Sequence, residues 1–351
     1  MYSFLLTAAL AQEAPPIVGG SVTSGYKAVG QIMAWHPNTG QIAFFCSGTL
    51  IHSRWVLTAA HCITGSQAAE GMEAQGFDIY FLSATYSYDE LSNNSYTALK
   101  RVVSMESHSG YTPNSQSISS DIGLLYLESA ITNITPVSLN RQAPSTNWND
   151  IQYVGFGITS DNASDSGIRR TVSVPLNNSN NQYWPYVSDS MFLFTWDPTG
   201  QTNICSGDSG GAAFRRTDDG KYLLAGVNSF GMNVQGGSNS CYGVGTVAGA
   251  TRVDAFYNWI NDRVPLDDSS SSEPASEPSA EPSMEPSTEP SSEPGSTPSE
   301  EGDFSAPFPT GEYDLEDSSP KVYGCSSSGT SFSLWALLSL LPFLSRRTRR
   351  S

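Results

Sequence analysis

Residues 17–264 predict an all-β fold, either a barrel or a sandwich, because short apolar runs alternate with clusters of turn-forming residues. Glycine, asparagine and serine make up most of those clusters. One helix is predicted, over 254–263, because its apolar residues share one face by i, i+3, i+4 spacing. These residues are Phe256, Trp259 and Ile260. The runs that predict strands are 41–45, 55–60, 122–127 and 222–227.

The amino end is apolar from residue 1 to residue 11 and finishes in Ala9-Leu10-Ala11, a signature of signal-peptide cleavage. It has no basic start and is shorter than the ~15–30 residues of a complete signal. We interpret residues 1–11 as the end of a signal peptide that starts upstream, with a buried first strand as the alternative. Residues 12–16 would follow as a short propeptide. Four of the five cysteines lie in 17–264, which also suits a secreted protein.

Composition changes abruptly after residue 264. Residues 265–320 contain 15 acidic residues and no basic residue, and Glu-Pro recurs every fourth position from Glu273. Such a segment has nothing to bury, so we expect a disordered, extended stalk. Residues 17–264 are only mildly acidic and carry no basic cluster, which argues against a nucleic-acid partner.

The sequence Gly207-Asp-Ser-Gly-Gly211 is the first candidate for chemistry. Small residues around Ser209 let backbone N–H groups converge on one point, as an oxyanion hole requires. The pattern Gly-x-Ser-x-Gly alone also fits the nucleophile elbow of α/β-hydrolases. Chain order separates the two, because every histidine precedes Ser209 and no aspartate precedes His61. Only the order His, Asp, Ser remains.

His61 follows the apolar run 55–60, which would hold its ring at a strand end as a general base. Asp121 is the one aspartate between His61 and Ser209 that heads an apolar run, so its carboxylate would be buried and would need a partner. A structural histidine and a solvated aspartate are the alternatives. The other histidines, at positions 36, 52 and 108, are interpreted as surface or loop residues.

Together these segments resemble the trypsin/chymotrypsin family of serine proteases, in series over 17–264. The matching segments are Ile17–Gly20, Cys46–Ile51, Leu57–Cys62, Asp121–Leu125, Cys205–Gly211, Asn228–Gly231 and Thr251–Val253. The resemblance implies two six-stranded antiparallel β-barrels with the site between them and a closing helix. It also implies a serine endopeptidase that acts on proteins or peptides through an acyl-enzyme.

Site residues follow from the same resemblance. Ser209 would be the nucleophile, His61 the general base and Asp121 the residue that orients it. Gly207 and Ser209 would supply the oxyanion N–H groups, and Ser229 would lie in the cleft beside Asp121. The implied disulfides are Cys46–Cys62 and Cys205–Cys241.

Activation and specificity are implied in the same way. The amino group freed at Ile17 would pair with Asp208, but Pro16 stands where relatives carry Arg or Lys, so we expect a separate processing protease. Asn203 lies six residues before Ser209, where trypsin relatives have an aspartate. With Gly231 leaving the pocket wall open, we expect cleavage after uncharged, medium to large residues.

The last segment, 321–351, holds Gly324-Cys325, a short apolar run over 332–344 and a closing arginine cluster. The run is shorter than the ~20 residues that span a bilayer, although the arginines are typical of a cytoplasmic flank. The segment resembles the sorting tails (MYXO-CTERM type) of myxobacterial surface proteins. That resemblance implies processing by a membrane protease or lipid attachment at Cys325, and anchoring at the bacterial cell surface. A retained transmembrane anchor and a free secreted enzyme are the alternatives.

We assign no metal and no cofactor, and we expect a monomer whose partners are its substrates, its processing proteases and, through the tail, a membrane. A catalytically silent binding protein of the same fold is the main alternative. Such proteins usually lose members of the triad, whereas all three are present here. A surface or adhesion protein would explain 265–351 but leave 17–264 without a purpose.

Overall fold

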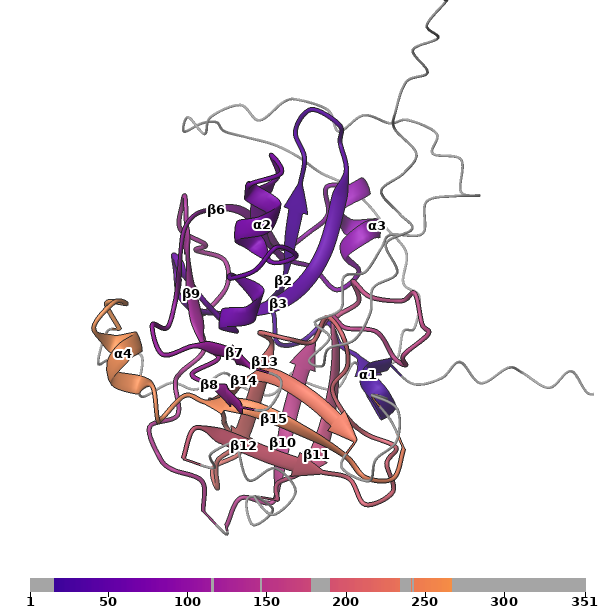
Figure 1. Ribbon diagram of the computed structural model, residues 1–351, viewed down its shortest axis with the longest axis vertical. Helices are drawn as coiled ribbons and strands as arrows, with labels where there is room; N and C mark the ends of the chain where they lie inside the picture. Colours follow the sequence, from indigo (N-terminus) through magenta and orange to yellow (C-terminus); the bar gives the residue numbers. More distant parts are fainter. Residues whose placement is uncertain are drawn as a thin grey trace, which may run out of the picture.

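The computed structural model describes residues 16–114, 117–145, 147–177, 190–233, 241 and 243–266. Within them the chain forms two β-sheet lobes, one above the other in Figure 1. The predicted signal peptide, most of the propeptide, nearly all of the stalk and the whole tail, Cys325 included, lie outside the described residues. Among the described residues, no helix is long and apolar enough to cross a membrane.

The amino-terminal lobe is a closed barrel of six antiparallel strands in the order β2-β3-β4-β9-β6-β5. Inward-facing aliphatic and aromatic side chains fill its interior, as in other small closed barrels. The strand predicted over 55–60 ends early, because Ala60 already begins a 3-10 turn, η1 (Ala60–Cys62). The strands are β2 (Val29–Trp35), β3 (Ile42–His52), β4 (Trp55–Thr58), β5 (Asp78–Ser83), β6 (Ala98–Ser107) and β9 (Gly123–Leu127).

The carboxy-terminal lobe is a seven-stranded sheet in the order β1-β11-β10-β13-β14-β15-β12. The predicted second six-stranded barrel is not confirmed. The short strand β1 pairs with the start of β11, at Arg170 and Thr171, and β12 meets the chain just after β11 through the bridge between Leu176 and Thr195 rather than as a paired strand. The strands are β1 (Ser21–Val22), β10 (Asp150–Gly155), β11 (Arg170–Pro175), β12 (Phe192–Trp196), β13 (Ala212–Arg216), β14 (Tyr222–Asn233) and β15 (Thr246–Arg252).

Helices are few and short. The helix predicted over 254–263 is present as α4 (Tyr257–Asn261), where Ile260 is fully buried. It is shorter than predicted: residues 253–256 form a turn ahead of it, and Asp254 in that turn pairs with Arg252 at the end of β15. The remaining elements are α1 (Pro16–Gly19), α2 (Ala69–Glu73), α3 (Ser87–Ser92), and the hairpin β7 (Thr112–Asn114) with β8 (Ser117–Ser119).

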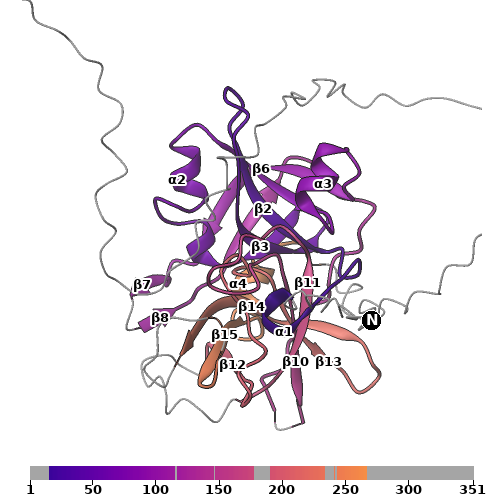
Figure 2. The ribbon, with the colours of Figure 1, turned by 90° about the vertical axis from the view of Figure 1, so that its right-hand side faces the viewer.

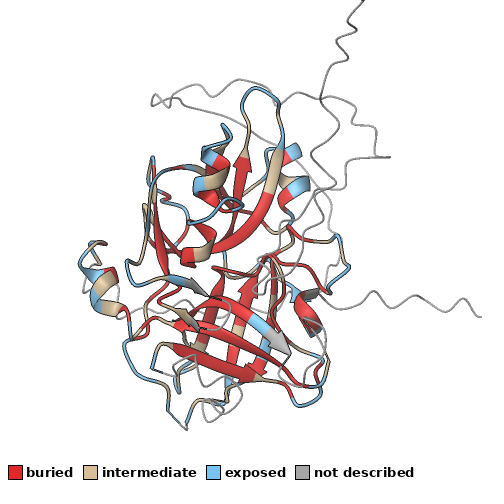
Figure 3. Cartoon of the chain, viewed as in Figure 1, coloured by how far each residue is buried: buried red, intermediate tan, exposed pale blue. Residues whose placement is uncertain are grey.

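The lobes share a core, and buried residues run through the strands of both (Figure 3). Arg169, just before β11, is 1% exposed and reaches from one lobe into the other. Its guanidinium donates to the carbonyls of Val29 (3.1 Å) and Gly25 (3.0 Å) and to the hydroxyl of Ser83 (3.1 Å). Figure 2 shows α1 at the carboxy-terminal lobe, where it contacts β11.

Candidate active site

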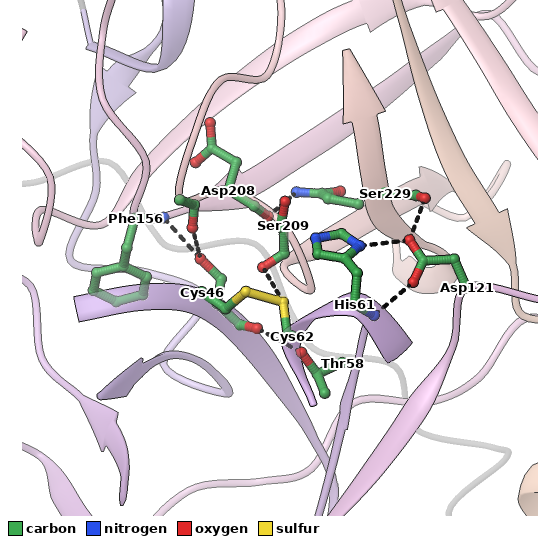
Figure 4. The surroundings of a disulfide bond; sticks show 12 residues. Cys46, Thr58, His61, Cys62, Asp121, Phe156, Asp208, Ser209 and Ser229 are labelled. Atoms are coloured by element: carbon green, nitrogen blue, oxygen red, sulfur yellow. Dashed lines mark hydrogen bonds and ion pairs between the residues drawn. A yellow bond between two sulfur atoms is a disulfide. The ribbon is translucent and has the colours of Figure 1, made fainter. Parts of the chain in front are cut away.

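His61 and Asp121 meet because their strands are neighbours. β4 and β9 pair antiparallel with Thr58 opposite Gly123, so the end of β4 lies beside the start of β9. The His61 backbone N–H donates to Asp121 Oδ1 at 2.9 Å, and His61 Nδ1 lies 2.7 Å from Asp121 Oδ2. Asp121 therefore holds His61 through its backbone and through its ring, with the other ring nitrogen turned away from the carboxylate (Figure 4).

Asp121 is 1% exposed, and groups from the carboxy-terminal lobe complete its surroundings. Ser229 on β14 donates to Oδ2 at 2.5 Å, and Thr251 on β15 donates to the backbone carbonyl at 2.7 Å. Burial alone would raise the pKa of Asp121. The charge of His61 and the hydrogen bonds from His61 and Ser229 outweigh that effect, so the pKa lies below its ordinary value. Asp121 is held as a carboxylate.

Ser209 lies in the loop before β13, and residues of barrel strands β3 and β4 contact that loop. Ser47 on β3 donates through its N–H to the Ser209 carbonyl (2.7 Å) and through its hydroxyl to the Gly207 carbonyl (2.8 Å). Gly210 has a φ of 80°, and a Cβ there would lie 2.1 Å from Thr58 Oγ1. In Figure 4 the His61 ring lies between Ser209 and Asp121.

Asp208 points away from His61 into the carboxy-terminal lobe (Figure 4) and is fully buried. Its carboxylate accepts hydrogen bonds from the N–H groups of Gly157 (2.8 Å) and Cys205 (2.9 Å). Burial raises its pKa to about 6 in spite of these bonds. A Cβ on Gly155 would lie 2.3 Å from Asp208 Oδ1, so only glycine leaves room for the carboxylate.

Ile17, the expected partner of Asp208, is fully buried and packs in the carboxy-terminal lobe with Ile151, Tyr153 and Ile204. Its neighbour Val18 packs against Cys205. In this uncleaved chain, no hydrogen bond or ion pair between Ile17 and Asp208 occurs among the described residues. The segment thus lies next to the Asp208 loop without supplying a charge to it.

Asn203 is 2% exposed at the base of the same lobe. Its Oδ1 accepts the N–H of Ile204 at 2.9 Å, whereas its Nδ2 has no hydrogen-bond partner within the described part of the chain. A Cβ on Gly231 would lie 3.9 Å from that Nδ2, which sets the amide beside the β14 wall. Ala248 faces Gly231 across the β14–β15 ladder. Ala248 was missed, because only strand register brings it here.

Two disulfides are present, with the pairing that the resemblance implied. Cys46–Cys62 joins β3 to the residue after His61, and Cys205–Cys241 closes the segment between the Ser209 loop and β15. Among the described residues, two groups of side chains are compact enough to hold a metal, but each contains both cysteines of one disulfide. Their sulfurs are bonded to each other and offer no thiolate.

The other histidines have structural contacts of their own. The ring of His36 packs edge-on against Phe77, and that of His108 packs against Phe256 and Trp259. His52 accepts the N–H of Arg54 in the β3–β4 turn. None of these contacts involves His61, Asp121 or Ser209.

Residues 17–260, well over half of the chain, match the model of the trypsin family. The chain belongs to the trypsin family. A chymotrypsin-like elastase family member 1 from Canis lupus familiaris is 28% identical over 255 residues, covering 70% of this trypsin-family chain and 91% of its own length. Trypsin-1 from Astacus astacus is 27% identical over 222 residues, with coverages of 62% and 86%.

Longer trypsin-family relatives match over a small part of their length. Clotting factor C from Tachypleus tridentatus is 26% identical over 233 residues, which cover 61% of this chain but only 22% of that protein. The chain thus spans about a fifth of that relative. The resemblance seen in the sequence over 17–264 is confirmed at the level of the family. The resemblance of the tail to sorting signals stays a prediction.

The two buried carboxylates are expected to change stability with pH in opposite directions. The pKa of Asp208, about 6, lies above the ordinary 3.8, so the contribution of this group to stability is fully present below about pH 4 and is lost as pH rises from about 4 through about 6. The pKa of Asp121 is lowered, so its contribution is present at neutral pH and is lost in acid.

We therefore expect the free energy of unfolding of Asp208→Asn, relative to that of the parent, to rise by about 3 kcal/mol between pH 4 and pH 7. Urea unfolding of the uncleaved chain measures it. Asp121→Asn serves as the matched variant and should change little relative to the parent over this range, because the contribution of a carboxylate with a lowered pKa is lost only below about pH 4. The test is how the stability difference from the parent changes with pH. Its absolute size is not informative, because either amide loses a hydrogen-bond acceptor at every pH. A parallel pH dependence for both variants would contradict the assignment.

Proposed function

We propose that this protein is a serine endopeptidase that hydrolyses peptide bonds through an acyl-enzyme. The observation that supports it best is the short contact between His61 Nδ1 and the buried carboxylate of Asp121, beside the glycine-rich loop that carries Ser209. Membership of the trypsin family supports the same reaction. Neither requires a cofactor.

In the proposed mechanism, Asp121 keeps the Nδ1 proton of His61 in place, so that the lone pair of Nε2 can take the proton of Ser209. The serine oxygen then attacks the scissile carbonyl, and the backbone N–H groups of Gly207 and Ser209 stabilise the oxyanion. His61 passes its proton to the leaving amine. Water repeats the sequence on the acyl-enzyme and regenerates Ser209.

The competing proposal is a catalytically silent member of the family kept for binding. A fluorophosphonate separates the two, because it labels only an activated serine. We expect labelling of the parent at Ser209, located by peptide mapping, and a loss of about 10⁴-fold or more in His61→Ala and Ser209→Ala. His52→Ala is the control, since its ring lies in the β3–β4 turn and is expected to change labelling little. A folded parent that begins at Ile17 and is not labelled would favour the silent binder.

The primary specificity pocket is proposed to be neutral, with Asn203 at its floor and Gly231 and Ala248 on its walls. A free amide donor favours a substrate side chain that accepts a hydrogen bond, such as glutamine. Lysine and arginine bring only donors and an unpaired charge. This argument refines the expected preference for uncharged residues.

We expect at least tenfold higher kcat/KM for a peptide substrate with glutamine before the scissile bond than for its lysine counterpart. Asn203→Asp should reverse the order by giving the lysine ammonium a carboxylate. Asn203→Leu is the matched control, because it removes the amide donor and should erase the advantage of glutamine over leucine. A parent profile dominated by lysine or arginine would overturn the neutral pocket.

The remaining segments are proposed as a signal peptide over 1–11, a short propeptide over 12–16, a stalk over 265–320 and a sorting tail over 321–351. The disulfides favour an oxidising location, so we propose export and anchoring at the outer surface through Cys325. As an extended chain at about 3.1 Å per residue, the stalk could hold the domain up to ~170 Å from the membrane.

Cell fractionation of the parent and of Cys325→Ala tests the anchor. The variant is expected in the medium rather than on the surface, whereas the neighbouring substitution Ser326→Ala, a control of similar size, should leave the protein attached. Equal surface retention of Cys325→Ala would rule out attachment through this cysteine and favour a retained transmembrane anchor.

A further inference from the structure

Arg170 is a buried cation that the proposed mechanism does not use. It opens β11, its side chain is 3% exposed, and it forms an ion pair at 3.1 Å with the more exposed Asp165. Its Nη1 donates to the carbonyls of Gly157 (2.9 Å) and Asp165 (2.7 Å). Its Nε is buried and makes no hydrogen bond to any other described residue. A buried guanidinium with an unused donor calls for a further partner.

The surroundings of Arg170 lead directly to Asp208. Gly157 joins the two groups, because its carbonyl accepts from Arg170 while its N–H donates to Asp208 Oδ1 at 2.8 Å. In the sheet, Arg170 also pairs with Gly155, and a Cβ on Gly155 would lie 2.3 Å from the same Oδ1. Both charges therefore lie against the short segment 155–157, whose residues are all buried.

The two charges stabilise each other electrostatically. Burial raises the pKa of Asp208, and the positive charge of Arg170 counteracts part of that rise. Burial likewise lowers the pKa of Arg170, and Asp165 and Asp208 both oppose that shift. A carboxylate in a buried site interacts strongly with a nearby cation even without direct contact.

Asp208 lies between the two residues proposed to supply the oxyanion N–H groups, Gly207 and Ser209. Its ionised form, bonded to Gly157 and Cys205, fixes the turn that aims those groups. In the uncleaved chain Ile17 has no free ammonium, so Arg170 is the nearby cation that favours the ionised form.

We propose that Arg170 is a positioning residue that keeps Asp208 ionised before cleavage at Ile17, so that the single-chain protein already has a formed oxyanion loop and measurable activity. The ammonium released at Ile17 then adds to a charge that is present, rather than creating the site. This inference rests on the proposed protease function and concerns how that same site is regulated.

Two forms of the full chain test the proposal. The uncleaved form keeps the parental residues 12–16. The processed form carries a site-specific protease sequence in their place and is cut so that it begins at Ile17, as checked by amino-terminal sequencing. The measured quantity is the rate at which a fluorophosphonate labels Ser209.

Arg170→Gln is expected to slow labelling of the uncleaved form by about tenfold or more, but that of the processed form by less than about threefold, because the Ile17 ammonium then replaces the lost charge. Arg170→Lys keeps the charge and should retain most of the uncleaved activity. Since the same variant is measured in both forms, the processed form also reports whether Arg170→Gln has folded.

Asp165→Asn is expected to change the labelling rate of the uncleaved form in the direction opposite to Arg170→Gln. It removes the carboxylate that forms an ion pair with Arg170 and that also raises the pKa of Asp208, while the hydrogen bond from the Thr159 N–H can remain on the amide oxygen. Below pH 6, where Asp208 with its pKa of about 6 is largely protonated, labelling of the uncleaved form should rise about two- to fivefold relative to the parent, with little change in the processed form.

Equal losses for Arg170→Gln in both forms would assign Arg170 a purely structural role and overturn the proposal. An uncleaved parent that is not labelled, beside a processed parent that is, would overturn it as well. If the processed parent itself is folded and unlabelled, the proposed protease function is the part that fails. These outcomes are distinguishable in one set of measurements.

Discussion

The burial of Asp121 is the constraint around which the two lobes close. Its carboxylate has left water almost completely, which would be costly without hydrogen-bond donors. One set of donors comes from His61 in the barrel, and the other comes from Ser229 in the opposite lobe. Neither lobe alone satisfies the charge. The lobes must therefore meet at this point, and the same contacts fix the ring of His61.

Arg169 and Arg170 extend this logic to a second place at the boundary. Consecutive residues of an extended chain point to opposite sides, so one start of a strand serves two purposes. Arg169 reaches into the barrel and donates to backbone and hydroxyl groups there, and its burial lowers its pKa to about 10. Arg170 turns to the Asp208 loop instead. Lobe packing and loop geometry are thus coupled through adjacent residues.

The local sequence pattern was sufficient to predict those parts of the site that depend on one continuous run of residues. The run 55–60 ahead of His61, and the apolar residues after Asp121, predicted strand ends that the structure contains as the β4–η1 junction and the start of β9. The strands were antiparallel neighbours, which the pattern could not reveal. The helix predicted over 254–263 is present, but it covers only Tyr257–Asn261.

Residues that act through tertiary contact were out of reach of the sequence. Ala248 faces Gly231 only because of strand register, and Ser47 contacts the Ser209 loop from another lobe. Closure of the second barrel was predicted by resemblance, yet it depends on how far β11 and β12 pair, and here they meet only near Leu176 and Thr195 among the described residues. Such competition between distant segments leaves no periodic signal in the chain. Arg170 likewise looks like an ordinary strand residue until Gly157 connects it to Asp208.

Asp121 and Asp208 lie on opposite sides of Ser209, and the contrast between them indicates where the site can be adjusted. Both are buried carboxylates with two or more donors. The interactions of Asp121 with His61 and Ser229 outweigh its burial, so its pKa falls below the ordinary value and it stays ionised without a further cation. Asp208 accepts hydrogen bonds from two backbone N–H groups and interacts with the charge of Arg170 without a direct contact, and its pKa is raised to about 6. An incompletely compensated buried charge responds to any new cation nearby. The part of the site that sets the oxyanion donors is therefore the part that remains open to control.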